Sequence, residues 1–242
     1  RQRQMCIRDS NYPLNDKEVE RYISVKPSDN QLALVDKPFY TFMHFGMNTA
    51  TDREWGAGVE KATDFTIKSI DAKQWVETAK SAGATGVILT CKHHDGFCLW
   101  PSEYTSFCVK NSSYKGDIVK EVSDECHKQG MDFGVYLSPW DMHDERYGTD
   151  AYNDYFCNQL TELLTNYGEI FEVWFDGAKG SNAKKFEYDW QRYYDLIRKL
   201  QPKANIAICG PDIRWVGNEG GKSRKSEYSV VPVSYTHLTL PT

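Results

Sequence analysis

Imidazole and carboxylate side chains suited to acid–base chemistry stand just after several apolar runs of the sequence. Residues 93–95 (HHD) and Asp176 directly follow two such runs, and Glu219 lies in the loop after a third. If the runs are parallel strands, the loops after them meet at one edge of the sheet. Two carboxyl groups that face each other across a sugar can hydrolyse a glycosidic bond, one by attacking the anomeric carbon and the other by protonating the leaving oxygen.

Other polar and aromatic side chains follow the same runs, and we expect them to converge on one face. A neutral imidazole carries one donor and one acceptor, which suits recognition of hydroxyl groups. Aromatic rings can pack on the apolar face of a sugar. The full set of candidates is His44, Glu54, Trp55, His93, His94, Asp95, Tyr136, Asp141, Trp174, Asp176, Arg214 and Glu219.

Each candidate also has a structural interpretation. Asp176 could cap the turn at Gly177, because Asp side chains commonly bond to the backbone of turns. A single histidine near a strand end, as at His44, is often a structural residue. Glu219 could be a solvated loop residue, and Glu227 is a rival nearby.

Metal binding is the main competing use of residues 93–95. Adjacent residues on an ideal strand face opposite ways, so His93 and His94 are not expected to hold one ion from a strand. No further histidine stands four residues away to complete a helical site. A serine nucleophile is not indicated, since the sequence has no G-x-S-x-G turn. We therefore expect no metal and no other cofactor.

Composition narrows the class of protein. The chain has 242 residues, of which 40% are hydrophobic, so it can bury a sizeable core. Its net charge of −5 argues against binding to a nucleic-acid backbone, and no apolar run is long enough to cross a membrane. The seven cysteines form no CxxC pair and are expected to be free thiols. No feature of the sequence indicates an oligomeric state.

Hydrophobic patterning predicts alternating strands and helices, with long loops after strands and short ones after helices. This asymmetry favours a TIM-type (β/α)8-like barrel over an open doubly wound sheet, because residues 45–48 lack the glycine-rich phosphate turn. Five strands are expected where a closed barrel has eight, so the barrel is expected to be incomplete at its C-terminus. The predicted strands are 39–45, 86–92, 133–138, 169–176 and 205–210; the predicted helices are 29–34, 70–82, 117–129, 151–167 and 186–200.

The two ends of the chain fit poorly with what they flank. Residues 1–10 and 233–242 resemble translated sequencing-adapter text found at the ends of metagenomic reading frames, and we expect both to be non-native tails. Residues 11–232 are then a partial catalytic barrel domain, cut from a longer gene.

Five motifs together carry a family resemblance. They are HFG (44–46), EW (54–55), KHHDGF (92–97), YLS (136–138) and WFDG (174–177). Their order resembles that of the α-L-fucosidases of glycoside hydrolase family 29, over about residues 11–232. The resemblance implies a (β/α) barrel, a retaining mechanism with Asp176 as nucleophile, and a fucosylated oligosaccharide or glycan as substrate. The residues that it implies hold the fucose ring are His44, Glu54, Trp55, His93, His94, Tyr136 and Trp174.

A further stretch, residues 210–219 (GPDIRWVGNE), resembles the loop of the subgroup that cleaves α-1,3/4-linked fucose. This likeness implies that Glu219 is the acid/base and that Arg214 orients a carboxylate or a sugar hydroxyl. An enzyme acting on external glycans is expected to be exported. Two other hypotheses stay open here: a catalytically inert fucose-binding fragment of the same family, and an unrelated barrel hydrolase.

Overall fold

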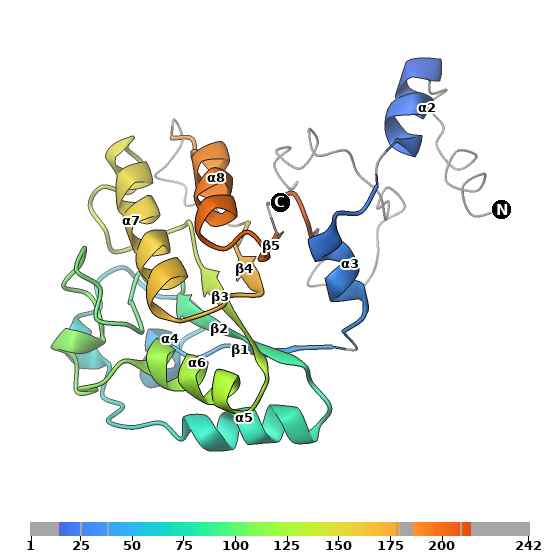
Figure 1. The fold of residues 1–242 in the computed structure, drawn as a ribbon. Helices are drawn as coiled ribbons and strands as arrows, with labels where there is room; N and C mark the ends of the chain where they lie inside the picture. The colour runs from blue at the N-terminus through green and yellow to red at the C-terminus, as the bar shows by residue number, and fades with distance from the viewer. Residues whose placement is uncertain are drawn as a thin grey trace.

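One parallel sheet forms the centre of the molecule. The computed structural model describes residues 15–24, 26–37, 39–177, 179, 186–208 and 210–213. Its strands lie in the order β1-β2-β3-β4-β5, and every neighbouring pair is parallel (Figure 1). The strands are β1 (Thr41–Met43), β2 (Gly86–Lys92), β3 (Asp132–Leu137), β4 (Glu172–Trp174) and β5 (Asn205–Ala207).

The strand order bears directly on the predicted architecture. The predicted parallel α/β fold is confirmed, and each of the five predicted strands overlaps an observed one. Spatial order follows chain order among these strands, without the reversal that marks a doubly wound sheet. A (β/α) barrel has the same sequential, parallel strand order. The closed barrel itself stays a prediction.

Four amphipathic helices pack against the sheet, as predicted. Figure 1 shows α5 and α6 beside one half of the sheet and α7 and α8 beside the other. Asp71, Asp117 and Asp189 begin three of them, each accepting a hydrogen bond from a first-turn backbone amide at 2.9–3.2 Å, which satisfies an otherwise unpaired donor. The helices are α5 (Ala72–Ser81), α6 (Ile118–Lys128), α7 (Ala151–Asn166) and α8 (Trp190–Leu200).

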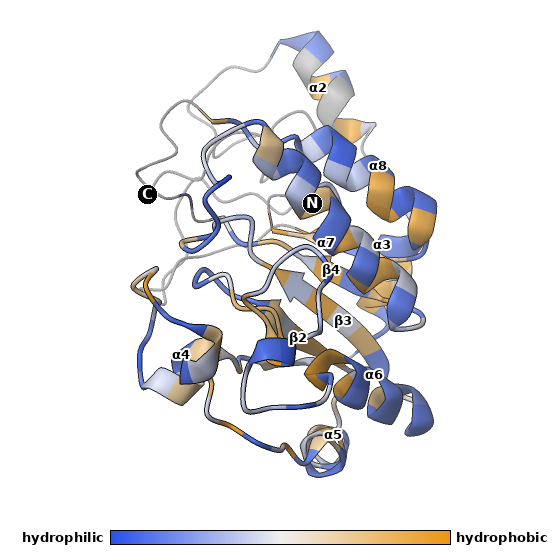
Figure 2. Cartoon of the chain, turned by 90° about the vertical axis from the view of Figure 1, so that its left-hand side faces the viewer, coloured by the Kyte–Doolittle hydropathy of each residue, from blue (hydrophilic) through white to orange (hydrophobic). Residues whose placement is uncertain are grey.

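The core lies between the sheet and these helices. Val87 and Leu89 of β2 and Val135 of β3 are fully buried against residues such as Val122 of α6 and Leu160 of α7. Figure 2 shows orange, apolar residues along the strands and mixed colours along the helices. Each helix therefore buries one stripe and leaves the other in solvent, which is the pattern that the sequence predicted.

Several short elements were not predicted. The predicted helix 29–34 is α3 (Asp29–Val35), which contacts the amino end of β5 through Asn30 and Asn205. The sequence predicts no helix or strand in residues 15–24 or 47–69. They contain α2 (Asp16–Ile23), α4 (Met47–Thr51) and η1 (Ala62–Asp64), and the 3-10 turn η2 (Val109–Asn111) follows β2. Elements of three to eight residues are too short to show a clear helical period.

A β-bulge ends the second strand. Thr90 pairs with Tyr136, but Lys92 pairs with the next residue, Leu137, so β2 carries one extra residue. Cys91 and Lys92 are both buried on the helix side, where Cys91 joins the core and Lys92 contacts α7. A bulge shifts the alternation of side chains and commonly re-aims residues next to a functional site.

The cysteines behave as expected within the described part of the chain. Free, buried thiols occur at Cys91, Cys98, Cys108, Cys126 and Cys157. Cys6 and Cys209 lie outside the described residues, as do both predicted tails, 1–10 and 233–242. No helix among the described residues is long and apolar enough to span a bilayer.

Glu172 is a buried acid on the strand that leads to Asp176. Its side chain is fully buried, and its Oε1 accepts a 3.4 Å hydrogen bond from Tyr40. Its Oε2 has no partner among the described residues. Burial raises the pKa of the Glu172 carboxyl to about 7, so this group ionises near neutral pH.

Replacing this acid is expected to remove a pH-dependent destabilisation. Because the pKa of Glu172 is higher in the folded state than in the unfolded state, the folded protein is most stable while this carboxyl group is protonated. That stability is complete below the pKa of the unfolded state and is lost as the pH rises through about 7. Glu172→Gln should therefore exceed the unchanged chain in free energy of unfolding by ~3 kcal/mol at pH 8 and by much less at pH 5. Urea titration at both pH values measures this, with the exposed Glu169→Gln as control. Equal differences at the two pH values would contradict the assignment.

Candidate active site

A cavity of about 870 Å³ opens at the carboxyl ends of β1 to β4. Eight of the ten candidate residues that the structure describes line it: His44, Glu54, Trp55, His93, His94, Tyr136, Trp174 and Asp176. The other two, Asp95 and Asp141, are buried and do not line the cavity. Five lining residues were not predicted: Phe42, Asn48, Thr49, Asp52 and Arg53. Arg214 and Glu219 lie outside the described residues. The structure therefore brings together segments that are up to 134 positions apart along the chain (42 to 176).

Strand register explains why these residues meet. Tyr136 pairs with Trp174 across β3 and β4, so both rings project from one level of the sheet. Asp176 stands two residues beyond Trp174 and is therefore on the same face. The amide of Phe175 extends the pairing by donating to the carbonyl of Ala207 at 3.1 Å. This bond holds the strand extended up to the residue before Asp176.

Asp176 is partly exposed, at 31%, and a hydrogen bond from Tyr136 orients it. The hydroxyl of Tyr136 donates to Asp176 Oδ2 at 2.9 Å, and His94 Nε2 lies 3.8 Å from the same oxygen. Burial and the nearby Asp176 charge hold the pKa of the Tyr136 phenol well above its usual range. Tyr136 is thus a permanent hydrogen-bond donor to this carboxylate.

The two adjacent histidines share the cavity, which corrects one expectation. Because neighbouring strand residues alternate, His93 and His94 were expected to face opposite ways. Both follow the last residue of β2 and its bulge, and their ring centroids are 4.1 Å apart. Within the described residues, no group of three or more His, Cys, Asp or Glu side chains is arranged to hold a metal ion.

Burial keeps both rings neutral. It lowers the pKa of His93 to about 3, helped by repulsion from His94 and His44. Burial also lowers the pKa of His94, and it outweighs the opposing attraction of Asp176. At neutral pH each ring therefore offers one donor and one acceptor, as hydroxyl recognition needs.

The rim of the cavity is a loop folded around a buried carboxylate. Glu60 accepts hydrogen bonds from the amides of Ala57 (2.7 Å) and Val59 (3.1 Å), and these bonds lower its pKa despite burial. The loop presents Trp55, which is 54% exposed and meets the Trp140 ring edge-on at 5.8 Å. Trp140 does not line the cavity, but its ring contacts those of Trp55 and His94. Only its position after a predicted strand could have indicated this role.

Two hydrogen-bond partners of the histidines were also missed. Asn48 lies next to His93, and Ser138 lies next to His94. Asn48 follows the predicted strand 39–45 and Ser138 ends the predicted strand 133–138, but neither residue type is distinctive enough to be singled out. The result is a cavity lined by aromatic and imidazole rings, by the oriented carboxylate of Asp176 and by the charged residues Asp52, Arg53 and Glu54. Apolar rings with a few hydrogen-bonding groups suit a hydroxyl-rich ligand.

Comparison with known proteins shows which family the chain resembles. A family model described as "Alpha-L-fucosidase" matches residues 41–232. Among curated proteins, the chain is 48% identical over 209 residues to "Alpha-L-fucosidase 1" of Arabidopsis thaliana, covering 84% of this chain and 41% of that protein. The chain thus spans about two fifths of that relative's length.

Solved structures agree. A glycoside hydrolase 29 family member from an unknown rumen bacterium is 45% identical with a TM-score of 0.77, covering 88% of this chain and 43% of that one. A GH29 fucosidase of Ruminococcus gnavus in complex with fucose is 38% identical with a TM-score of 0.76, covering 85% and 48%.

Proposed function

The chain belongs to the alpha-L-fucosidase family, and on that premise we propose that it releases terminal α-L-fucose from fucosylated oligosaccharides or glycoconjugates by double displacement. The observation that carries this proposal is the set of eight predicted residues around one cavity, with Asp176 oriented by Tyr136. Aromatic rings together with several hydroxyl-binding groups are what a monosaccharide requires.

In this mechanism the cavity binds the fucose ring first. Trp55 and Trp174 pack on its apolar face and its C6 methyl group. His44, His93 and His94, together with Glu54, contact the hydroxyl groups. All of these residues line the cavity.

The first chemical step forms a fucosyl ester. A carboxylate oxygen of Asp176 attacks the anomeric carbon while the bond to the leaving oxygen breaks, and Glu219 gives its proton to that oxygen. In the second step Glu219 takes a proton from water, the water oxygen attacks the anomeric carbon, and the ester bond to Asp176 breaks. Both carboxyl groups return to their starting states, and configuration is retained.

The position of β5 supports Glu219 as the acid/base. β5 lies beside β4, and Asp212 just beyond it is bound by Arg198 at 2.5 and 2.6 Å and accepts from the amide of Ile206 at 2.7 Å. Glu219 stands six positions after Ile213, and an extended chain of that length reaches about 20 Å. Ile213 pairs with Ala207, which pairs with Trp174, so Ile213 lies two strand spacings, about 10 Å, from the end of β4. The chain to Glu219 is therefore long enough to reach Asp176 with the carboxyl separation of roughly 5–5.5 Å that retention requires.

We extend the proposal to linkage. The likeness of residues 210–219 to the loop of the α-1,3/4 subgroup supports a preference for branched glycans with fucose in these linkages. Comparing hydrolysis of a Lewis-type trisaccharide with that of an α-1,2-linked fucoside tests this, and faster cleavage of the α-1,2 linkage would contradict it.

Glu219→Ala is expected to lower kcat on a fucoside with a poor leaving group by about 10²–10⁴-fold, because protonation of the leaving oxygen is lost. Azide should then restore turnover of an aryl fucoside and yield α-L-fucosyl azide. The rival Glu227→Ala should retain activity and gain nothing from azide. Rescue of Glu227→Ala in place of Glu219→Ala would move the acid/base to Glu227.

The experiment for the function itself is hydrolysis of an aryl α-L-fucoside by the gene product that carries this chain. Release of fucose with an α-configured first product supports the proposal. Fucose binding without turnover would favour the inert, fucose-binding alternative instead.

A further inference from the structure

Each of the two adjacent cavity histidines is held at Nδ1 by a different kind of neighbour. His93 Nδ1 lies 3.2 Å from the amide nitrogen of Asn48, and His94 Nδ1 lies 2.7 Å from the hydroxyl of Ser138. We propose that Asn48 and Ser138 are positioning residues that fix opposite tautomers in His93 and His94, so that the pair offers one donor and one acceptor to neighbouring hydroxyls of the bound sugar.

The amide of Asn48 determines the tautomer of His93. Its nitrogen can only donate, and it also lies 3.3 Å from the carbonyl oxygen of Glu54, which can only accept. Its two protons are therefore directed at Glu54 O and His93 Nδ1. Turning the amide over would set Oδ1 against the Glu54 carbonyl, so the orientation is fixed by the network. His93 Nδ1 is thus the acceptor, and its proton is on Nε2.

Ser138 determines the opposite tautomer in His94. The hydroxyl of Ser138 donates to the carbonyl oxygen of Trp140 at 2.7 Å, which uses its single proton. The short contact with His94 Nδ1 then requires Nδ1–H to be the donor. Ser138 is fully buried and His94 is 3% exposed, so water does not compete for these bonds. His94 Nε2 is therefore the ring nitrogen with the lone pair.

The charge state of the rings supports one proton on each. Burial lowers the pKa of both, and repulsion from neighbouring groups lowers it further: His94 and His44 act on His93, and His44 and Lys92 act on His94. Asp176 is the negative group that acts on His94 in the opposite direction. Two neutral rings with opposite tautomers follow.

The consequence is a polarity pattern at the cavity wall. His93 presents Nε2–H, a donor, and His94 presents the lone pair of Nε2, an acceptor, 3.8 Å from Asp176 Oδ2. With ring centroids only 4.1 Å apart, the two groups address hydroxyls on adjacent carbons. One hydroxyl accepts from His93 and its neighbour donates to His94. This assignment rests on the proposed fucosidase function for the identity of the sugar, but not for the tautomers.

The tautomers are tested directly by long-range ¹H–¹⁵N spectra of protein labelled with ¹⁵N-histidine, without ligand, at pH 7. His93→Gln and His94→Gln variants assign the two signals. We expect the proton on Nε2 in His93 and on Nδ1 in His94. The same tautomer in both rings would overturn the proposal.

A variant that reverses one bond tests the role of Asn48. In Asn48→Asp a carboxylate accepts where the amide donated, so the proton of His93 should move to Nδ1 and leave Nε2 without its donor. Asn166→Asp, an exposed position whose oxygen keeps its 3.3 Å bond from Thr165, is the matched control. Ser138→Ala gives an independent test, because His94 Nδ1–H loses its acceptor and the His94 proton should redistribute toward Nε2.

Kinetics then connect the tautomers to the sugar. Asn48→Asp should lower kcat/KM for an aryl α-L-fucoside by about 10-fold to 100-fold, mainly through KM, while Asn166→Asp leaves it unchanged. Against the 2-, 3- and 4-deoxy fucosides, this loss should vanish for the one substrate that lacks the hydroxyl bound by His93. An inverted His93 tautomer with unchanged kcat/KM, or a loss equal for all three deoxy substrates, would overturn the proposal.

The tests of the two tautomers and the test of fucosidase activity can fail independently. A fucosidase whose two histidines share one tautomer would contradict only the inference about Asn48 and Ser138. Opposite tautomers in a protein that neither binds nor cleaves fucosides would contradict the fucosidase function, and with it the reading of fucose hydroxyls.

Discussion

Asp176→Asn is expected to lower kcat for an aryl α-L-fucoside by about 10⁴-fold or more, because the neutral amide cannot form the fucosyl ester. The change is nearly isosteric. Tyr136 can still donate to the remaining carbonyl oxygen, as it now does to Oδ2 at 2.9 Å. The free energy of unfolding should therefore change little, which separates loss of chemistry from loss of structure. Initial rates over a substrate series, with urea unfolding of the same samples, measure both.

Asp195→Asn is the matched control for this variant. Asp195 is an exposed residue of α8, and its Oδ1 accepts a 2.8 Å hydrogen bond from Gln191 that an asparagine would keep. It should retain full activity. A kcat of Asp176→Asn close to that of the unchanged protein would remove Asp176 as nucleophile.

Lys92→Met is expected to lower the free energy of unfolding by about 3–5 kcal/mol, because it leaves Asp141 buried without its counter-charge. Lys92 is fully buried and donates to Asp141 Oδ2 (3.0 Å), to Gln159 Oε1 (2.9 Å) and to the Tyr152 hydroxyl (3.3 Å). Three partners on two segments lose their donor together. Urea unfolding monitored by tryptophan fluorescence measures the change.

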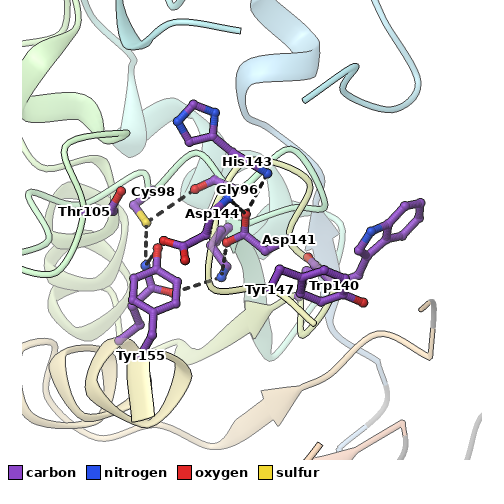
Figure 3. Close-up of polar contacts among 12 residues, drawn as sticks. Gly96, Cys98, Thr105, Trp140, Asp141, His143, Asp144, Tyr147 and Tyr155 are labelled. Carbon is purple, nitrogen blue, oxygen red and sulfur yellow. Dashed lines mark hydrogen bonds and ion pairs between the residues drawn. The ribbon is translucent and has the colours of Figure 1, made fainter. Parts of the chain in front are cut away.

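The same pair positions the histidines. Asp141 Oδ1 accepts from the amides of His143 (3.0 Å) and Asp144 (2.9 Å), so the loop after β3 is tied to Lys92, the residue directly before His93 (Figure 3). Figure 3 also shows Gly96 beside Asp141, where a Cβ would collide with the carboxylate. Lys92→Met should therefore also weaken substrate binding.

An exposed ion pair provides the control for this prediction. Lys120 and Asp124 lie 2.8 Å apart on α6 with both side chains more than half exposed. Because water solvates both charges, Lys120→Met should cost less than about 1 kcal/mol. A Lys92→Met variant no more destabilised than Lys120→Met would show that the buried pair does not hold this part of the fold together.

Much of the fold follows from sequence because its elements are long enough to show a period. The β2 run has three consecutive apolar residues (87–89) and α6 repeats its apolar residues at helical spacing, so both were predicted within one residue of the observed ends. The five-residue α4 has no such period, and it carries Asn48 into the cavity. Short elements are decided by the tertiary contacts around them, which one-dimensional patterns do not contain.

The site was predictable where residue type and strand end coincide, and not where local geometry departs from the ideal. Asp176 and Tyr136 stand at strand ends and were found. The shared orientation of His93 and His94 depends on the bulge at Lys92, which no residue type signals. The raised pKa of Glu172 was not predicted, because this residue lies within an apolar run and only its burial in the folded protein raises the pKa of its carboxyl group.

The central claim, that Asp176 carries the fucosyl group, is tested most directly by trapping the intermediate. The gene product that carries this chain would be incubated with a 2-deoxy-2-fluoro-fucosyl fluoride, which slows breakdown of the ester, and digested for mass spectrometry. The account predicts one added 2-fluorofucosyl group, on the peptide that contains Asp176. A label on any other residue, or turnover of fucosides with no covalent label at all, would contradict it.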